Sequence, residues 1–124
     1  MPHCILEYSS NVIDAPDWTR LLLDVHEVLM ATGLFVRSDI KSRIIEHGRY
    51  VIGDGSQDRA FVTLNVQILS GRSDEVKRQV AEAALELLSR TFTKTLNELK
   101  CSISVQITDI HRPSYCRRIS YAEE

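Results

Sequence analysis

The sequence lacks any long apolar run and any strong excess of charge of one sign. No stretch approaches the roughly 18 consecutive apolar residues that a membrane-spanning helix requires. Its 15 basic and 17 acidic side chains give a net charge of −2, so no basic field favours nucleic acid or an acidic membrane. The start of the chain also lacks the basic and long apolar regions of a signal peptide. We therefore expect a cytoplasmic protein that binds neither nucleic acid nor membrane.

The sequence also lacks the residue clusters that hold metals or form nucleophilic catalytic sites. Its three cysteines, Cys4, Cys101 and Cys116, are widely spaced without a Cys-x-x-Cys pair, and its four histidines show no metal-binding spacing. Free thiols in a reducing compartment fit this pattern better than a disulfide scaffold or a zinc site. We expect Cys4 to be a small buried residue and His26 to lie on a helix surface or interface. No metal and no cofactor is expected.

What the sequence does contain is one β-α-β pattern followed by a second, similar one. The 124 residues, of which 44% are apolar and 26% charged, suit a single domain with one core. The two units cover about residues 1–58 and 59–110, and a polar tail, 111–124, follows. The tail could be an arm on a neighbouring molecule, or it could be frayed.

The first unit begins with a predicted strand over residues 3–8. Asp14 is suited to cap the helix that follows, Pro16 suits its first turn and Gly33 its end. Between them apolar residues recur at three- and four-residue spacing, which predicts one buried helix face. Residues 36–52 are then a strand region that glycines interrupt.

The second unit repeats this order. Residues 60–69 form an apolar or alternating run that predicts a strand, and Ser73 can cap the next helix. Two acidic residues directly after Ser73 are favourable at the positive end of the helix dipole. The apolar stripe of this helix runs from Val76 to Phe92, and the alternation over 101–110 predicts a half-buried strand.

Two such units predict an α/β (α+β) fold, with a four-stranded sheet and two helices. Right-handed crossovers would place both helices on the same face of the sheet. The opposite face then has no helix to cover it. We expect apolar residues on that face to be buried by self-association, which is the simplest way to cover it.

The first candidate catalytic residue is Pro2, which lies two positions before the apolar run 4–6. Removal of Met1 would leave proline as the amino terminus, a secondary amine that can act as a base. An α-amino group titrates near pH 8, and burial beside cations lowers its pKa toward neutrality. The strand that follows would hold the amine in place, as a general base requires. Proline also falls at this position by chance, at about 5% of residues, so the position alone assigns no role.

The second candidate is Arg72, in the segment Ser70–Lys77 that leads from a predicted strand into a predicted helix. The preceding glycine allows a sharp turn, and the arginine lies beside the unpaired backbone N–H groups of the helix start. A guanidinium together with a helix dipole can bind a carboxylate. The alternative is that Arg72 pairs with an acidic residue on the surface.

Together these residues resemble the tautomerase superfamily, named for 4-oxalocrotonate tautomerase, and most closely its 5-carboxymethyl-2-hydroxymuconate isomerase family. The resemblance extends to about Ile110 and loosens in the tail. It is carried by Pro2, by the helix-opening residues 71–77, and by residues 3–7, 31–35, 42–43 and 58–62.

This resemblance implies a cofactor-free isomerase or tautomerase of aromatic-compound catabolism, assembled as a homotrimer with its sheets inward. It would move a proton within an unsaturated 2-hydroxy or 2-oxo acid that carries two or three carboxylates. Pro2 would be the general base, and Arg72 would bind substrate. Lys41 stands where the family isomerase carries a second arginine, and lysine cannot grip a carboxylate with two parallel bonds. Arg43, two residues on, could take over that contact.

One function of another class stays open at this point. The chain could be an oligomeric module that binds a small ligand without catalysis, with Pro2 inert. Processing of Met1 discriminates between the two, because only the enzyme needs a free proline amine.

Overall fold

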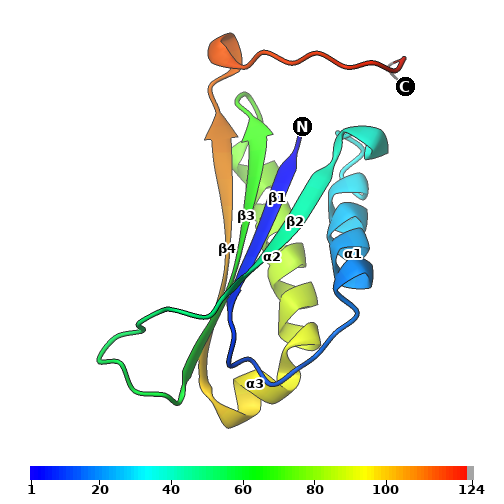
Figure 1. Ribbon diagram of the computed structural model, residues 1–124. Helices are drawn as coiled ribbons and strands as arrows, with labels where there is room; N and C mark the ends of the chain where they lie inside the picture. The colour runs from blue at the N-terminus through cyan, green and yellow to red at the C-terminus, as the bar shows by residue number, and fades with distance from the viewer. Residues whose placement is uncertain (123–124) are drawn as a thin grey trace.

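The computed structural model describes residues 1–122, which form a four-stranded mixed sheet with two long helices (Figure 1). The strand order is β2-β1-β3-β4; β1 is parallel to β2 and antiparallel to β3, and β4 is parallel to β3. The predicted α+β fold is thereby confirmed. The elements are β1 (His3–Ser9), α1 (Trp18–Met30), β2 (Lys41–His47), β3 (Arg59–Leu69), α2 (Asp74–Thr91), α3 (Thr93–Glu98) and β4 (Lys100–Ile110), with short 3-10 helices at Arg37–Asp39 and Arg112–Ser114.

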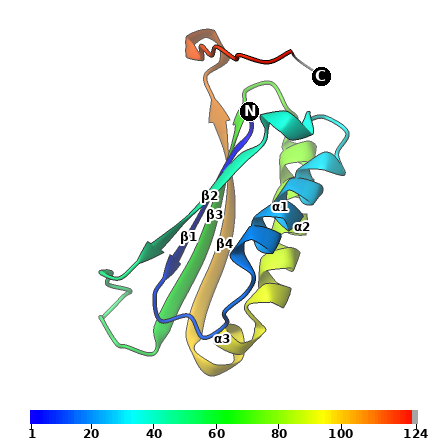
Figure 2. The same cartoon turned by 45° about the vertical axis from the view of Figure 1, so that its right-hand side comes forward.

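Alternation along the strands decides which face of the sheet is buried. One row of register partners runs Ile44, Leu6, Leu64, Val105 across the four strands, and all four side chains belong to the core. Both long helices lie on this side of the sheet (Figure 2). Their buried residues recur at four-residue spacing, which is why the helical stripes were visible in the sequence: Leu21, Val25 and Leu29 on α1, and Val80, Ala84 and Leu88 on α2.

The helix ends follow the predicted signals except at the start of α1. Ser73 caps α2, where its side chain accepts a hydrogen bond from Val76 N at 3.2 Å. Gly33 follows the end of α1 with a φ of 72°, a conformation that favours glycine. The cap of α1, however, is Asp17, whose Oδ1 accepts from Arg20 N at 3.0 Å, so the prediction of Asp14 was wrong.

Asp14 instead ties the loop before α1 to α3, an element that the sequence did not predict. Its carboxylate accepts hydrogen bonds from Thr95 N at 2.9 Å, from Thr95 Oγ1 at 2.8 Å and from Lys94 N at 3.3 Å. Burial acts to raise the pKa of Asp14, but these hydrogen bonds outweigh it and the pKa is lowered. Both aspartates are suitable caps, and only this long-range contact assigns them different roles.

The predicted strand region 36–52 contains a much shorter strand. Residues 37–39 form a 3-10 turn, β2 covers Lys41–His47, and the chain then leaves the sheet in a long projecting loop (Figure 1). Val51 in this loop is 81% exposed, the highest value among the large apolar residues of the described chain.

The middle of the helix-free face is mostly polar, and further apolar residues lie toward its ends. Three rows of register partners form the middle: Lys41, His3, Gln67, Thr108; Arg43, Ile5, Asn65, Gln106; and Ile45, Glu7, Thr63, Ser104. Ile5 and Ile45 are the apolar members of these rows, and alternation places Phe61, Leu69 and Ile110 on the same face. Polar contacts cross the face, including His47 Nε2 to Glu7 Oε1 at 2.9 Å and Thr108 Oγ1 to Asn65 Oδ1 at 2.8 Å.

Candidate active site

The start of the chain is fixed at one end of the sheet. Pro2 is fully buried, and its carbonyl oxygen accepts a hydrogen bond from Lys41 N at 3.0 Å, which extends the pairing of β1 with β2. The amino group of Met1 donates to the carbonyl oxygen of Asp39 at 3.2 Å. The amino terminus is therefore held in one place, as a catalytic amine requires.

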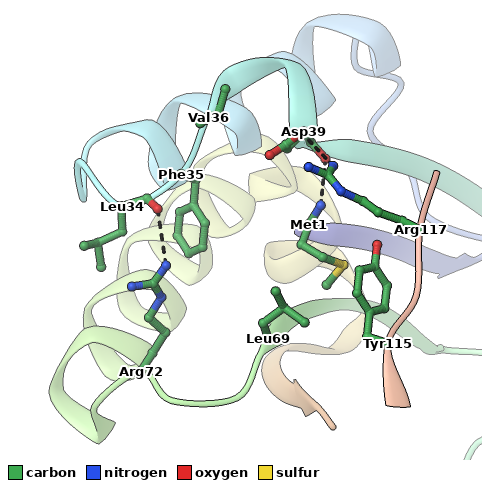
Figure 3. Close-up of a pocket in the computed structure, with 9 residues that line it drawn as sticks. All are labelled: Met1, Leu34, Phe35, Val36, Asp39, Leu69, Arg72, Tyr115 and Arg117. Atoms are coloured by element: carbon green, nitrogen blue, oxygen red, sulfur yellow. Dashed lines mark hydrogen bonds and ion pairs between the residues drawn. The ribbon is translucent and has the colours of Figure 1, made fainter. Parts of the chain in front are cut away.

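A cavity of about 190 Å³ opens around Met1 (Figure 3). Four parts of the chain contribute to its wall: the segment after α1, the 3-10 turn before β2, the end of β3 with the turn that follows, and the tail. The lining residues are Met1, Leu34, Phe35, Val36, Asp39, Leu69, Arg72, Tyr115 and Arg117. The wall is thus mostly apolar with a few charged groups, as in many small-molecule sites.

The surroundings of the terminal amine favour its neutral form. Burial lowers the pKa of the Met1 amine, and the positive charges of Lys41 and Arg117 lower it further, against the opposing charge of Asp39. Lys41 Nζ donates to the same Asp39 carbonyl oxygen as the amine, at 3.1 Å, so this cation lies beside the amine. An amine with a lowered pKa is unprotonated at neutral pH in a larger share of molecules and can accept a proton.

Arg72 lines this cavity, so the structure brings it together with the amino terminus. The preceding Gly71 has a φ of 116°, which turns the chain out of β3 and presents the arginine just before α2. The guanidinium carbon of Arg72 lies 5.5 Å from the centre of the Phe35 ring, and Nη2 donates to Leu34 O at 3.4 Å. Within residues 1–122 Arg72 forms no ion pair, which argues against the surface-acid alternative.

The other two predicted cations lie outside the cavity. Lys41 is exposed at the start of β2 and is adjacent to the amine only through Asp39. Arg43 points onto the open face of the sheet, where its Nη1 donates to His3 Nδ1 at 3.3 Å. Burial, followed by the charge of Arg43, lowers the pKa of His3.

Three lining residues were missed by the sequence reasoning: Asp39, Tyr115 and Arg117. The tail turns back over the end of the sheet, and Arg117 Nη1 lies 3.0 Å from Asp39 Oδ1 in an ion pair. This hydrogen bond lowers the pKa of Asp39. The only sequence signal for these residues was the arginine-rich composition of the tail, which does not show where the tail lies in the fold.

Comparison with known proteins identifies the family. A sequence profile of 5-carboxymethyl-2-hydroxymuconate isomerases, CHMI, matches residues 2–120. The chain belongs to this family. It is 32% identical over 111 residues to the 5-carboxymethyl-2-hydroxymuconate Delta-isomerase of Escherichia coli. The matched region covers 90% of this chain and 88% of that protein. Its membership confirms the family predicted from the sequence and supports an isomerase over a non-catalytic binding module.

Solved structures of CHMI-family and other tautomerase proteins have the same fold. The crystal structure of a 5-carboxymethyl-2-hydroxymuconate isomerase from Deinococcus radiodurans R1 is 28% identical, with a TM-score of 0.87 over 94% of this chain and 88% of that chain. A structure described as a fused 4-OT symmetric trimer is 18% identical, with a TM-score of 0.70 over 88% of this chain and 85% of that chain. At that identity the likeness concerns the fold alone.

The remaining candidates have structural explanations. His26 Nε2 lies 2.7 Å from Ser42 Oγ between α1 and β2. Cys4 is buried, and burial raises the pKa of its thiol to about 12, which disfavours the nucleophilic thiolate. Among the described residues, no three His, Cys, Asp or Glu side chains could hold a metal ion, and no helix is long and apolar enough to cross a membrane.

Proposed function

We propose that this CHMI-family isomerase moves a proton within an unsaturated 2-hydroxy or 2-oxo acid with two or three carboxylates, of the 5-carboxymethyl-2-hydroxymuconate type, in the catabolism of aromatic compounds. Removal of Met1 makes Pro2 the amino terminus and the general base. The observation that carries the proposal is the position of the chain start, where Met1, the residue before Pro2, lines a cavity that Arg72 also lines. An ultraviolet absorbance assay of 2-hydroxymuconate-type dienols tests it.

The chemistry needs only one base and anion-binding groups. The Pro2 nitrogen takes a proton from the dienol and returns it at another carbon of the conjugated system. Arg72 binds a carboxylate and stabilises the negative charge that grows on the substrate as the proton leaves. Neither Lys41 nor Arg43 lines the cavity, and either could contact a further carboxylate that extends beyond it, Lys41 from beside the amine and Arg43 from the open face. No metal or cofactor takes part in such a transfer.

The surroundings that lower the pKa of the Met1 amine support the role of Pro2. In the processed chain the terminal nitrogen belongs to Pro2, which is fully buried and paired with β2 through its carbonyl oxygen. Because Pro2 adjoins Met1, we expect the burial and the charge of Lys41 that lower the pKa of the Met1 amine to act in the same direction on this nitrogen. A base with a pKa near the working pH gives the most efficient proton transfer.

Lys41→Ala and Asp39→Asn are expected to shift the acidic limb of kcat/KM in opposite directions. The charge of Lys41 lowers the pKa of the Met1 amine and the charge of Asp39 raises it, and we expect the same signs for the adjacent Pro2 amine. Activity appears as the amine loses its proton, so removing Lys41 moves the limb to higher pH and removing the Asp39 charge moves it to lower pH. Arg78→Ala, an exposed position on α2, serves as the control. If the acidic limb of kcat/KM stays at the wild-type pH in both variants, the group that titrates is not the terminal amine.

We further propose a homotrimer with the open sheet faces inward. No described element covers the open face, and the loop that follows β2 and carries the exposed Val51 projects away from the sheet. Covering this face would bury Ile5 and Ile45 and place Arg43 against a neighbouring subunit. Most side chains in the middle of this face are polar. Hydrogen bonds between subunits would therefore contribute more to their alignment than buried apolar area would. Light scattering at high dilution is expected to give the trimer mass, and a stable monomer would contradict the proposal.

The compartment proposed for the protein is the cytoplasm. Cys4, Cys101 and Cys116 are all unbridged in the structure. Three unbridged thiols suit a reducing environment.

A further inference from the structure

We propose that Arg117 is a specificity-determining residue that binds the second carboxylate of the substrate, across the cavity from Arg72. This inference rests on the proposed function and adds a residue from the tail to its binding site. It predicts that the enzyme selects acids with two carboxylates over otherwise matched acids with one.

The position of Arg117 is the first support. Arg72 and Arg117 approach the cavity from different parts of the chain, and Met1 lies between them (Figure 3). Lys41, the residue predicted to bind the second carboxylate, does not line the cavity. Arg117 therefore offers a planar guanidinium fork, which suits a carboxylate better than the ammonium group of lysine.

The charge balance of the site is the second support. Arg72 and Arg117 both line the cavity, and the positive charges of Lys41 and Arg117 act on the terminal amine. Two guanidinium groups in one cavity wall complement a ligand that carries two carboxylates. A monocarboxylate can engage only one of them.

Asp39 explains how Arg117 is held ready without substrate. Its Oδ1 accepts from Arg117 Nη1 at 3.0 Å, and the side chains of the arginine and the aspartate are 30% and 22% exposed. The ion pair thus lies at the accessible edge of the cavity, where an arriving carboxylate can reach the guanidinium. The five donors of an arginine allow it to bind a second carboxylate beside the first.

The start of the tail is held by contacts that do not involve Arg117. Its root is fixed by Arg112, whose Nη2 and Nε donate to Ser70 O at 2.9 Å and 3.2 Å, and by His111 Nδ1, which lies 2.8 Å from Ser114 Oγ. Substitution of Arg117 is therefore expected to leave the fold and the tail root in place. A thermal unfolding curve of the variant checks this.

The test compares two unreactive ligands that differ in one group: hexa-2,4-dienedioate, with two carboxylates, and hexa-2,4-dienoate, with one. Calorimetry on the Met1-processed protein measures both. Losing a hydrogen-bonded charge pair corresponds to about 10- to 100-fold, so Arg117→Ala should weaken binding of the dienedioate by that factor. Binding of the dienoate should change by less than about 2-fold. Arg72→Ala, in contrast, should weaken both ligands.

Two controls separate carboxylate binding from a structural role. Arg118→Ala, the adjacent exposed arginine that does not line the cavity, should leave both affinities unchanged. Asp39→Asn removes the partner of Arg117 and should keep or improve dienedioate binding. If Asp39→Asn instead weakens dienedioate binding as much as Arg117→Ala does, the arginine acts only by holding Asp39, and the proposal is wrong. Equal loss of both ligands in Arg117→Ala also overturns it.

These binding measurements do not depend on turnover. If the processed protein binds the dienedioate through Arg117 but isomerises no 2-hydroxydienoate, the proposed function fails while the assignment of Arg117 stands. If it turns over dicarboxylic dienols and Arg117→Ala has unaltered KM and ligand affinity, the assignment fails while the proposed function stands.

Discussion

Protein that retains Met1 is expected to be about 10²- to 10⁴-fold less active than protein that begins at Pro2, the range typical of a lost general base. In the unprocessed chain the proline nitrogen is part of a peptide bond, so its lone pair is delocalised and cannot accept a proton. Met1 also lines the cavity itself, where its side chain occupies space needed by substrate. Both effects reduce activity, while the fold is unchanged.

The two forms can be made from one sequence and compared directly. Mass spectrometry gives the fraction that retains Met1, an aminopeptidase converts that fraction, and the ultraviolet assay is run before and after. Activity should rise in proportion to the processed fraction. Thermal unfolding of both samples controls for a difference in folding. Full turnover by a sample shown to retain Met1 would rule out Pro2 as the base.

Arg72→Ala is expected to lower kcat by about 10²- to 10³-fold, the scale found when a donor to a developing oxyanion is removed. The arginine has no ion pair among the described residues, and its hydrogen bond to Leu34 O is long, at 3.4 Å. It can therefore move onto a substrate oxygen at little cost. Arg78→Ala, on the exposed face of α2, is the matched control and should leave kcat and KM unchanged.

The same kinetics separate Arg72 from Lys41. If Lys41 contacts a remote carboxylate that is bound equally in ground and transition state, Lys41→Ala mainly raises KM. Lys41→Arg restores the fork and should be neutral or improve binding of dicarboxylates. Because Lys41 also acts on the amine, these constants are compared at a pH above the acidic limb. Wild-type kcat and KM in Arg72→Ala would show that this arginine is only a surface residue.

The sequence by itself determined the family, the two long helices and the existence of the four strands. Burial within a strand or helix follows the local periodicity of the chain, so the four strands, the stripe of α2 and the cap at Ser73 could be predicted from neighbouring residues. Pro2 before a strand and Arg72 before a helix are also local patterns, and they led to the family that the comparison confirmed.

The tertiary structure decided what depends on contacts between distant residues. In the sequence, Asp14 and Asp17 are equally good candidates to cap α1. The hydrogen bond from Thr95, about eighty positions away, holds Asp14 elsewhere and leaves the cap to Asp17. Lys41 and Arg43 share a strand face by alternation, yet only the sheet register shows that this face is the open one.

The tail shows the same limit most clearly. It has no periodicity that would place it, because its path is set by single polar contacts and not by a buried stripe. Arg117 reaches Asp39 across 78 positions of sequence. The free energy of such an ion pair depends on where the fold brings the two charges together. The sequence around either residue does not identify its distant partner.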